Sequence, residues 1–186
     1  MSFARRRSLQ EEEKCADPAK ARARALEALA AQELSSAVLY DRLRRRFTDQ
    51  AAAYAVAEMV RCGYLDDDRY AAARAYGLRS AGKSRRAAAQ TLRQKGLTPP
   101  QIETALEEAY APDDTGEDPD LAAACGLVQR RYRAKLEAGR KDLVTAALLR
   151  RGFAYPAFSG SFDPAALAAL VREALRRAEE AQTPPV

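Results

Sequence analysis

Apolar side chains recur at helical spacing through most of the chain. Leu39, Leu43 and Phe47 lie four residues apart, so they share one helix face, and Arg44 and Arg45 fall away from that face. Comparable apolar faces are Leu26/Leu29/Ala30/Leu34, Val56/Met59/Val60, Ile102/Leu106/Ala109/Tyr110, Leu121/Cys125/Val128/Tyr132 and Leu167/Leu170/Val171/Ala174/Leu175. The small apolar side chains also suit close-packed helices. The pattern therefore predicts an all-α protein.

Start and stop signals divide this pattern into groups of three helices. Aspartate caps a helix and proline fits its first turn, so Asp-Pro pairs predict helices that begin at Pro18, Pro119 and Pro164. Further signals are the caps Ser35, Thr48, Ser84 and Thr98 and the stops Gly63, Gly96 and Gly152. We expect a mobile arm at 1–17, three-helix repeats at 18–65, 66–116 and 117–177, and a disordered tail at 178–186.

The stretch from Cys62 to Tyr70 reads as a corner between two helices. Gly63 can take the left-handed conformation that ends a helix, and the carboxylates Asp66 to Asp68 suit the start of the next one. We expect Tyr64 and Leu65 to fill the corner. Three consecutive carboxylates could also suggest a metal site, but capping is the favoured interpretation.

One motif recurs at the end of the second helix of each group. It is a leucine, a basic residue three positions later, usually a glycine, and then an apolar residue: Leu43 to Phe47, Leu92 to Leu97 and Leu148 to Phe153. The leucines lie about 50 to 55 residues apart, a period typical of stacked helical repeats. The basic position Arg46, Lys95 and Arg151 therefore recurs in space as well as in sequence.

The composition favours a binding protein with an anionic partner over an enzyme. The 186 residues carry 31 Lys and Arg against 26 Asp and Glu, a formal charge of +5, which favours an anionic partner. Histidine is absent, and with it the commonest general base and the mixed Cys and His zinc sites. No phosphate-binding glycine motif or nucleophile with a base occurs. We expect no enzyme activity, no cofactor and no metal.

Cysteine usage and hydropathy predict a cytoplasmic, soluble protein. Cys15, Cys62 and Cys125 are odd in number and widely separated, which argues against a disulfide framework. We expect Cys125 to be a small core residue. No run of eighteen apolar residues occurs, so we expect no membrane contact.

Basic residues exceed what helix capping requires. The candidate binding residues form a strip along the repeats: Arg44, Arg45, Arg46, Arg85, Arg86, Arg93, Lys95, Arg130, Arg131, Arg133, Lys141, Arg150 and Arg151. Such a strip could meet phosphates or an acidic protein surface. The alternative is that cations in the last turn only complement the helix dipole. Tyrosines such as Tyr132 could stack on bases, although core packing is the favoured role.

Several of these stretches resemble the RecX regulatory proteins of bacteria. They are Gly63 to Ala71, Gly82 to Arg86, Leu92 to Leu97 and Leu148 to Phe153, and the similarity covers roughly Pro18 to Arg177. The resemblance implies an elongated, curved array of three tandem three-helix repeats. It also implies a non-catalytic regulator that binds the RecA filament on single-stranded DNA and inhibits its recombinase, ATPase and SOS coprotease activities in DNA repair.

The resemblance implies a basic modulatory surface as well. The positions that match the family's repeat motif are Arg85, Arg86, Arg93, Lys95, Arg150 and Arg151. Two features depart from the pattern, since Arg46-Phe47 lacks the glycine and 154–162 is an insertion. We expect a monomer that makes a weak direct contact with DNA. The alternative function is a tandem helix-turn-helix-like DNA-binding protein that acts without RecA.

Overall fold

The computed structural model describes residues 13–111, 118–153, 169, 172–173 and 176–177. Regular structure in these residues is helical, apart from one isolated bridge between Cys15 and Phe47. The predicted all-α class is confirmed for them. The insertion 154–162, the start of the last predicted helix at Asp163 and the tail 178–186 lie outside the described residues.

Contacts divide the chain into two units. The first contains Met1–Tyr70 with Gln94–Thr98, and the second contains Ala71–Arg93 with the described residues from Pro99 onward. The boundaries of the three predicted repeats therefore stay a prediction.

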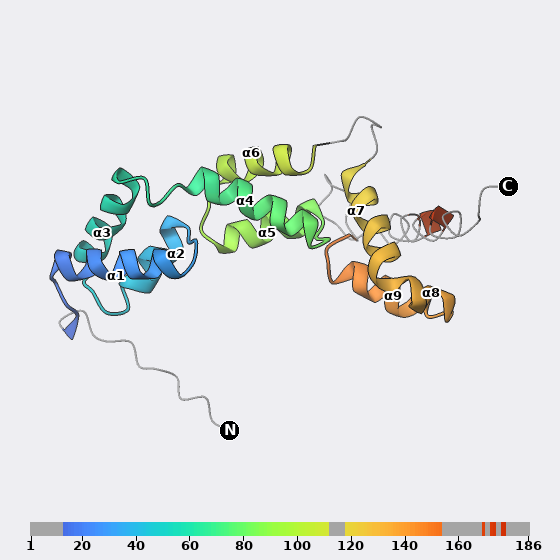
Figure 1. Cartoon of the computed structure of the whole chain (residues 1–186), viewed down its shortest axis with the longest axis horizontal. Helices are drawn as coiled ribbons and strands as arrows, with labels where there is room; N and C mark the ends of the chain where they lie inside the picture. Colours follow the sequence, from blue (N-terminus) through green and yellow to red (C-terminus); the bar gives the residue numbers. More distant parts are fainter. Residues whose placement is uncertain (1–12, 112–117, 154–168, 170–171, 174–175, 178–186) are drawn as a thin grey trace, which may run out of the picture. The chain divides into compact units, whose positions relative to one another are not determined.

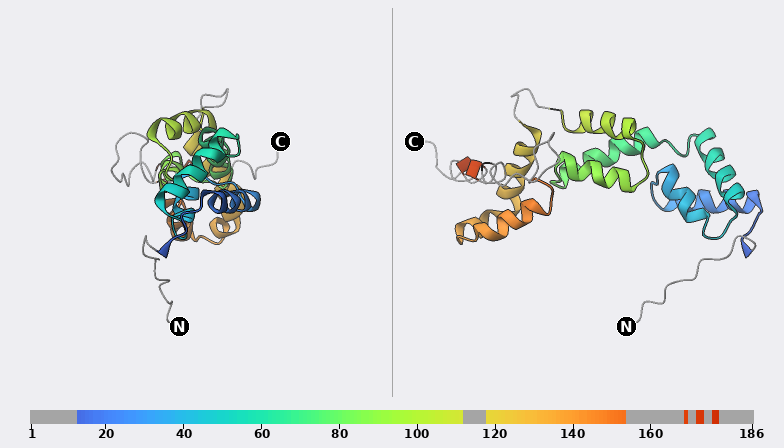
Figure 2. Two further views of the ribbon diagram at one scale, coloured as in Figure 1. Left: turned by 90° about the vertical axis from the view of Figure 1, so that its left-hand side faces the viewer. Right: turned by 180° about the vertical axis from the view of Figure 1, so that it is seen from behind.

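The first unit holds three complete helices, α1 (Pro18–Ala31), α2 (Ser36–Leu43) and α3 (Asp49–Arg61). They pack against one another, as Figures 1 and 2 show in blue and teal. The predicted start at Pro18 is confirmed, because the Asp17 carboxylate accepts from the backbone N–H of Ala19 at 2.9 Å. The Ser35 and Thr48 side chains cap α2 and α3 in the same way.

The second unit holds most of α4 (Asp67–Ser80) and α5 (Arg85–Gln94), with α6 (Pro99–Ala109) alongside them in green in Figures 1 and 2. It continues with α7 (Pro119–Leu127), a π-helical turn (Val128–Tyr132), α8 (Arg133–Glu137) and α9 (Lys141–Leu149). The sequence pattern predicted one long helix here, and the π-helical turn was not predicted. Cys125 is buried as expected, in a cluster with Val128, Leu148 and Phe153.

Some predicted core positions are wrong. On α1 the buried side chains are Ala21, Ala25 and Ala28, while Ala30 is exposed. Leu34 is buried as predicted, and Leu26 and Leu29 are partly buried against the same core, so the alanines add to the predicted leucine face. Val60 is 50% exposed although it was predicted to face the core.

The predicted corner after α3 is confirmed in its backbone and half confirmed in its side chains. Gly63 has φ +73°, and the N–H groups of Tyr64 and Leu65 both donate to the Met59 carbonyl, at 2.9 and 3.1 Å. Leu65 is buried, but Tyr64 is 57% exposed and does not fill the corner. Asp66 caps α4, since its carboxylate accepts from Arg69 N–H at 2.9 Å.

A backbone joint recurs at the repeated motif. The carbonyl of each recurring basic residue accepts a hydrogen bond from a chain segment distant in sequence. The three pairs, carbonyl first, are Arg46 with Cys15 N–H at 2.9 Å, Lys95 with Ser35 Oγ at 2.5 Å, and Arg151 with Ser84 N–H at 3.0 Å. Ser35 and Ser84 are both fully buried at these joints. The recurring position is thus fixed through its backbone, which the sequence argument did not anticipate.

The joint explains why the first motif lacks a glycine. A Cβ on Gly96 would overlap Ala37 at the start of α2, and a Cβ on Gly152 would overlap Ser84 and Ala87 at the start of α5. At Phe47 the neighbour is instead the extended segment around Cys15. Residues 1–12 of the predicted arm lie outside the described residues, whereas Cys15 is held by hydrogen bonds to Arg46 and Thr48.

Within the parts of the chain that the structure covers, every helix is too short or too polar to cross a membrane.

Candidate anion-binding site

The predicted basic residues of the first motif are solvent-facing and partly paired. Arg44, Arg45 and Arg46 are all exposed. Arg44 lies 3.6 Å from the Asp49 carboxylate and 5.7 Å from the centre of the Tyr40 ring. Its charge is therefore partly compensated, so Arg45 and Arg46 are the better candidates for an external anion at this end of α2.

The candidate residues on and after α5 differ in their exposure and in their backbone contacts. Arg85 is half-buried, and its N–H donates to the Asp120 carboxylate at 2.8 Å. Arg86 and Arg93 are exposed, while Lys95 is half-buried beside its joint. These residues fall in both units, so the continuity of the predicted strip stays a prediction.

The later cations also differ in their surroundings. Arg130, Arg131, Arg133 and Lys141 are all exposed. The Arg130 guanidinium lies over Gly126, where an added Cβ would come within 3.3 Å of it. Only Arg131 of these four lines a hollow described below, so the structure separates the candidates that the sequence grouped together.

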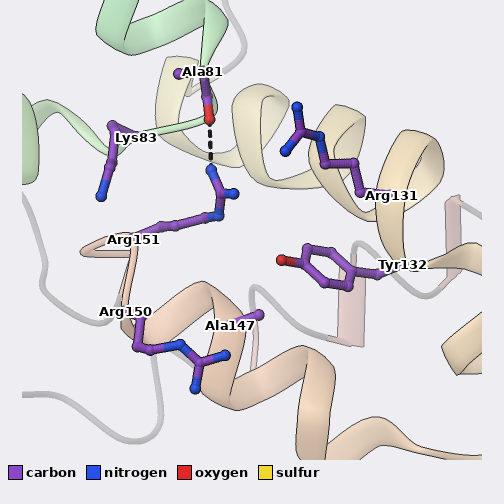
Figure 3. A pocket seen from close by; sticks show the side chains of 7 residues that line it. All are labelled: Ala81, Lys83, Arg131, Tyr132, Ala147, Arg150 and Arg151. Carbon is purple, nitrogen blue, oxygen red and sulfur yellow. Dashed lines mark hydrogen bonds between the residues drawn. The ribbon is translucent and has the colours of Figure 1, made fainter.

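That hollow is a concave basic feature in the described part of the second unit. It has a volume of about 440 Å³ and is lined by Ala81, Lys83, Arg131, Tyr132, Ala147, Arg150 and Arg151. Figure 3 shows that the loop before α5, the π-helical turn and the end of α9 each contribute a basic side chain. Three members of the predicted strip, Arg131, Arg150 and Arg151, thus come together here.

Arg151 links two walls of the hollow. Its Nη1 donates to the Ala81 carbonyl at 2.5 Å, drawn as a dashed line in Figure 3, and lies 3.5 Å from the Gly82 carbonyl. On the other side of this loop, Tyr110 Oη donates to the Lys83 carbonyl at 2.9 Å. Burial raises the pKa of Tyr110, so its hydroxyl stays protonated and keeps donating. The loop that carries Lys83 is therefore held from both sides.

The described residues of the hollow do not compensate its charge. Among them the lining contains four cations and no carboxylate. Within the described residues, the ion pairs involve other cations, such as Arg61 with Glu58 at 2.9 Å and Arg140 with Asp142 at 3.4 Å. Hydrogen bonding to Arg61 and Arg140 lowers the pKa of Glu58 and of Asp142, as expected for paired carboxylates. A concave site lined by one sign of charge concentrates its field on an incoming anion.

Tyr132 adds a polar group to the same wall. The residue is half-buried against the cluster around α7, and the Lys135 ammonium lies 5.6 Å from the centre of its ring. Figure 3 shows its hydroxyl directed toward the centre of the hollow. One ring face is therefore occupied by a cation, which favours hydrogen bonding through the hydroxyl over stacking on a base.

Sequence reasoning omitted Lys83 from the candidate residues. Gly82-Lys83-Ser84 lacks the upstream glycine of a phosphate-binding motif, so the sequence pattern did not select Lys83. The signal that could have identified Lys83 is the repeated joint. Ser84 donates to the Arg151 carbonyl, and this contact brings the residue before Ser84 next to the basic end of α9.

Comparison with known proteins identifies the family. A protein named Regulatory protein RecX from Trichlorobacter lovleyi is 33% identical over 135 residues, which are 69% of this chain and 84% of that protein. The chain belongs to the RecX family of regulatory proteins. A RecX protein from Myxococcus xanthus is 36% identical over 106 residues, which are 54% of each chain. A family model described as "RecX, second three-helix domain" matches residues 66–106, where the sequence resemblance is most specific.

Solved structures support the RecX fold. The crystal structure of RecX from Lactobacillus salivarius has a TM-score of 0.61 at 15% identity and covers 84% of this chain and 96% of its own. A second crystal structure of regulatory protein RecX has a TM-score of 0.60 at 22% identity, with 84% and 73% covered. Three three-helix groups are consistent with these RecX folds.

Proposed function

We propose that this RecX protein regulates the RecA recombinase by binding RecA filaments on single-stranded DNA and inhibiting their ATPase, recombinase and SOS coprotease activities. Membership of the RecX family is the observation that carries the proposal. The protein acts as a monomer in the cytoplasm, where it modulates DNA repair and recombination. It acts by binding, without catalysis of its own.

The basic residues support this mode of action. A nucleoprotein filament is strongly anionic, and exposed arginines attract such a surface over a distance of about 10 Å at 0.1 M salt. Arg131 and Arg150 are exposed, and both line the hollow. Cations of this kind bridge neighbouring filament subunits and thereby alter ATP turnover without contact with ATP.

The experiment is a titration of RecA ATPase on single-stranded DNA with the wild type and the R131E/R150E variant. The wild type suppresses turnover, and the variant is at least tenfold less potent because two cations become carboxylates. The matched control is R22E/R74E, which changes the net charge equally at exposed positions on α1 and α4 that do not line the hollow. The control retains most of the suppression.

Two results would contradict the proposal. If the wild type leaves ATP hydrolysis and strand exchange unchanged at amounts equal to RecA, the RecA assignment is wrong. Tight binding of duplex DNA by the protein alone would then favour the tandem helix-turn-helix-like alternative. If R22E/R74E and R131E/R150E lose potency equally, net charge and not the hollow determines the interaction.

A further inference from the structure

We infer that the hollow between the loop before α5, the π-helical turn and α9 is a phosphate-binding site that takes the phosphate groups of a nucleotide or of a nucleic-acid strand. This inference does not depend on RecA, since it concerns a ligand that the protein binds by itself. It assigns a ligand class to a hollow that combines Arg150 and Arg151 of the third repeated motif with Lys83 and Arg131, which lie outside that motif.

The donors around the hollow carry the first step. Lys83, Arg131 and Arg150 reach it from three separate elements, and Arg151 stands at its centre in Figure 3. Ammonium and guanidinium groups only donate hydrogen bonds, so the four cations offer charged donors to a ligand. No carboxylate stands among the described lining residues. Among the described residues no carboxylate pairs with Lys83 or Arg150, so an incoming anion meets uncompensated charge.

Hydrogen bonds also hold part of the lining in place before a ligand binds. Arg151 is held by the Ala81 carbonyl, and the carbonyl of Lys83 is held by Tyr110. Donors fixed before binding lose less entropy when a ligand arrives. In the same wall, the ring of Tyr132 packs against the cluster around α7, and the Lys135 ammonium lies 5.6 Å from its centre. Arg151 and the backbone that carries Lys83 are therefore fixed before a ligand arrives.

Charge and size favour phosphate over other anions. Four cations in one hollow exceed what a single carboxylate needs, whereas a phosphate group carries up to two negative charges and several acceptor oxygens. A volume of about 440 Å³ suits a unit the size of one nucleotide. A double helix is far wider and could contact only the rim, so the site favours a free nucleotide or a single strand.

The test measures binding by the full chain in the absence of RecA. A fluorescein-labelled 15-mer of deoxythymidine reports the strand by fluorescence anisotropy, and ATP and pyrophosphate serve as competitors. The variant K83Q/R150Q removes two charges whose side chains make no hydrogen bond to other described residues. It should weaken binding at least tenfold and reduce the slope of log K against log salt by about 1.4.

Two further variants define the site. Y132F keeps the ring against α7 but removes the hydroxyl, so it should weaken binding severalfold at unchanged stability. R22Q/R74Q removes two exposed charges that do not line the hollow and should retain binding within about twofold. Circular dichroism confirms that each variant is folded.

The competitors distinguish the two sources of phosphate. Displacement of the labelled strand by ATP and pyrophosphate at micromolar concentrations supports a site for a free nucleotide. Strand binding that neither competitor reverses supports a site for the nucleic-acid backbone. Polyglutamate is the control ligand, because it is anionic but carries no phosphate. If it binds with equal affinity and loses the same affinity in K83Q/R150Q, the site accepts an acidic peptide equally well and the assignment to phosphate is wrong.

Two other results overturn the inference. One is equal weakening by R22Q/R74Q and K83Q/R150Q, and the other is the absence of binding to the strand, ATP and pyrophosphate alike. Neither result bears on RecA, whose ATPase is measured separately. Loss of phosphate binding with retained RecA inhibition would therefore reject this inference and leave the proposed function standing.

Discussion

At the scale of single residues, two glycines determine how helix ends approach neighbouring segments. Gly63 and Gly96 both follow a helix and both have positive φ, +73° and +75°. They differ in their surroundings, since a Cβ on Gly63 would meet nothing within 4 Å, whereas a Cβ on Gly96 would overlap the Cβ of Ala37. At the corner, glycine is therefore needed only for its left-handed conformation. At the joint it is needed both for that conformation and for the close approach of Ala37.

Substitution of these glycines should separate conformational strain from packing. Gly63→Ala should cost about 1 kcal/mol of unfolding free energy, because only the left-handed conformation is penalised. Gly96→Ala should cost about 2 kcal/mol more, because the start of α2 must also move away. Urea denaturation of both variants checks this. Equal losses in the two variants would show that the contact with Ala37 relaxes at little cost.

Local signals predicted single residues well where one residue decides. Asp17 caps α1, Gly63 and Gly96 end their helices, and Leu39 and Leu43 are buried as their spacing required. The incorrect predictions concern residues whose burial depends on which other segment packs against them. Tyr64 has a large aromatic side chain that is often found in cores, but at this corner only Leu65 is buried and Tyr64 is exposed.

At the scale of elements, the joints were beyond prediction because they connect residues 31 to 67 positions apart. Ser35 was predicted as a cap, and it is one, but its hydroxyl also donates to the Lys95 carbonyl. The π-helical turn Val128–Tyr132 has the apolar spacing of an ordinary helix. It presents Arg131 and Tyr132 to the hollow together, which a regular helical reading of the sequence could not show.

A second contact between elements joins the starts of α2 and α5 to later aspartates. Asp67 accepts from Ser36 N–H at 2.8 Å, and Asp120 accepts from Arg85 N–H at 2.8 Å. Each carboxylate thus satisfies an N–H in the first turn of a helix to which it does not belong. Burial raises the pKa of Asp120 to about 6, against an ordinary value of 3.8, and the hydrogen bond from Arg85 only partly offsets it.

Asp120 should therefore make stability depend on pH. Its pKa is higher in the folded than in the unfolded chain, so the folded protein binds more protons between pH 4 and 6, and ionisation of Asp120 lowers stability as pH rises through that range. Asp120→Asn keeps an acceptor for Arg85 and removes this charge. The variant should be more stable than the wild type above pH 6, by at most about 3 kcal/mol, with the advantage disappearing near pH 4.

Thermal or urea unfolding at several pH values measures this difference. Asp120→Ala is the control, because it removes the acceptor as well and leaves the Arg85 N–H without a partner, so it should lose stability across the range. An advantage of Asp120→Asn that does not change between pH 4 and 7 would contradict the assignment to ionisation.

At the scale of the whole molecule, a modest net charge is distributed unevenly. The chain carries only +5, yet four cations and no carboxylate stand among the described residues that line one hollow of the second unit. Elsewhere in the described residues, arginines such as Arg44, Arg61 and Arg140 pair with neighbouring carboxylates. The composition alone favoured an anionic partner, but only the fold shows where the uncompensated charge is concentrated.

A binding mechanism and a catalytic one make different demands on the whole protein. If this RecX protein inhibits RecA by occupying the filament, suppression of ATPase should depend on the ratio of the two proteins, reach a plateau within the binding time, and remain constant afterwards. A catalyst would instead act at trace amounts and progressively.

Because the contact is electrostatic, raising salt from 50 to 200 mM should weaken it by about tenfold or more and restore turnover reversibly. Titration of ATPase at both salt concentrations, corrected for RecA alone, measures this. Progressive inhibition by trace amounts, unaffected by salt, would show that occupancy is the wrong mechanism.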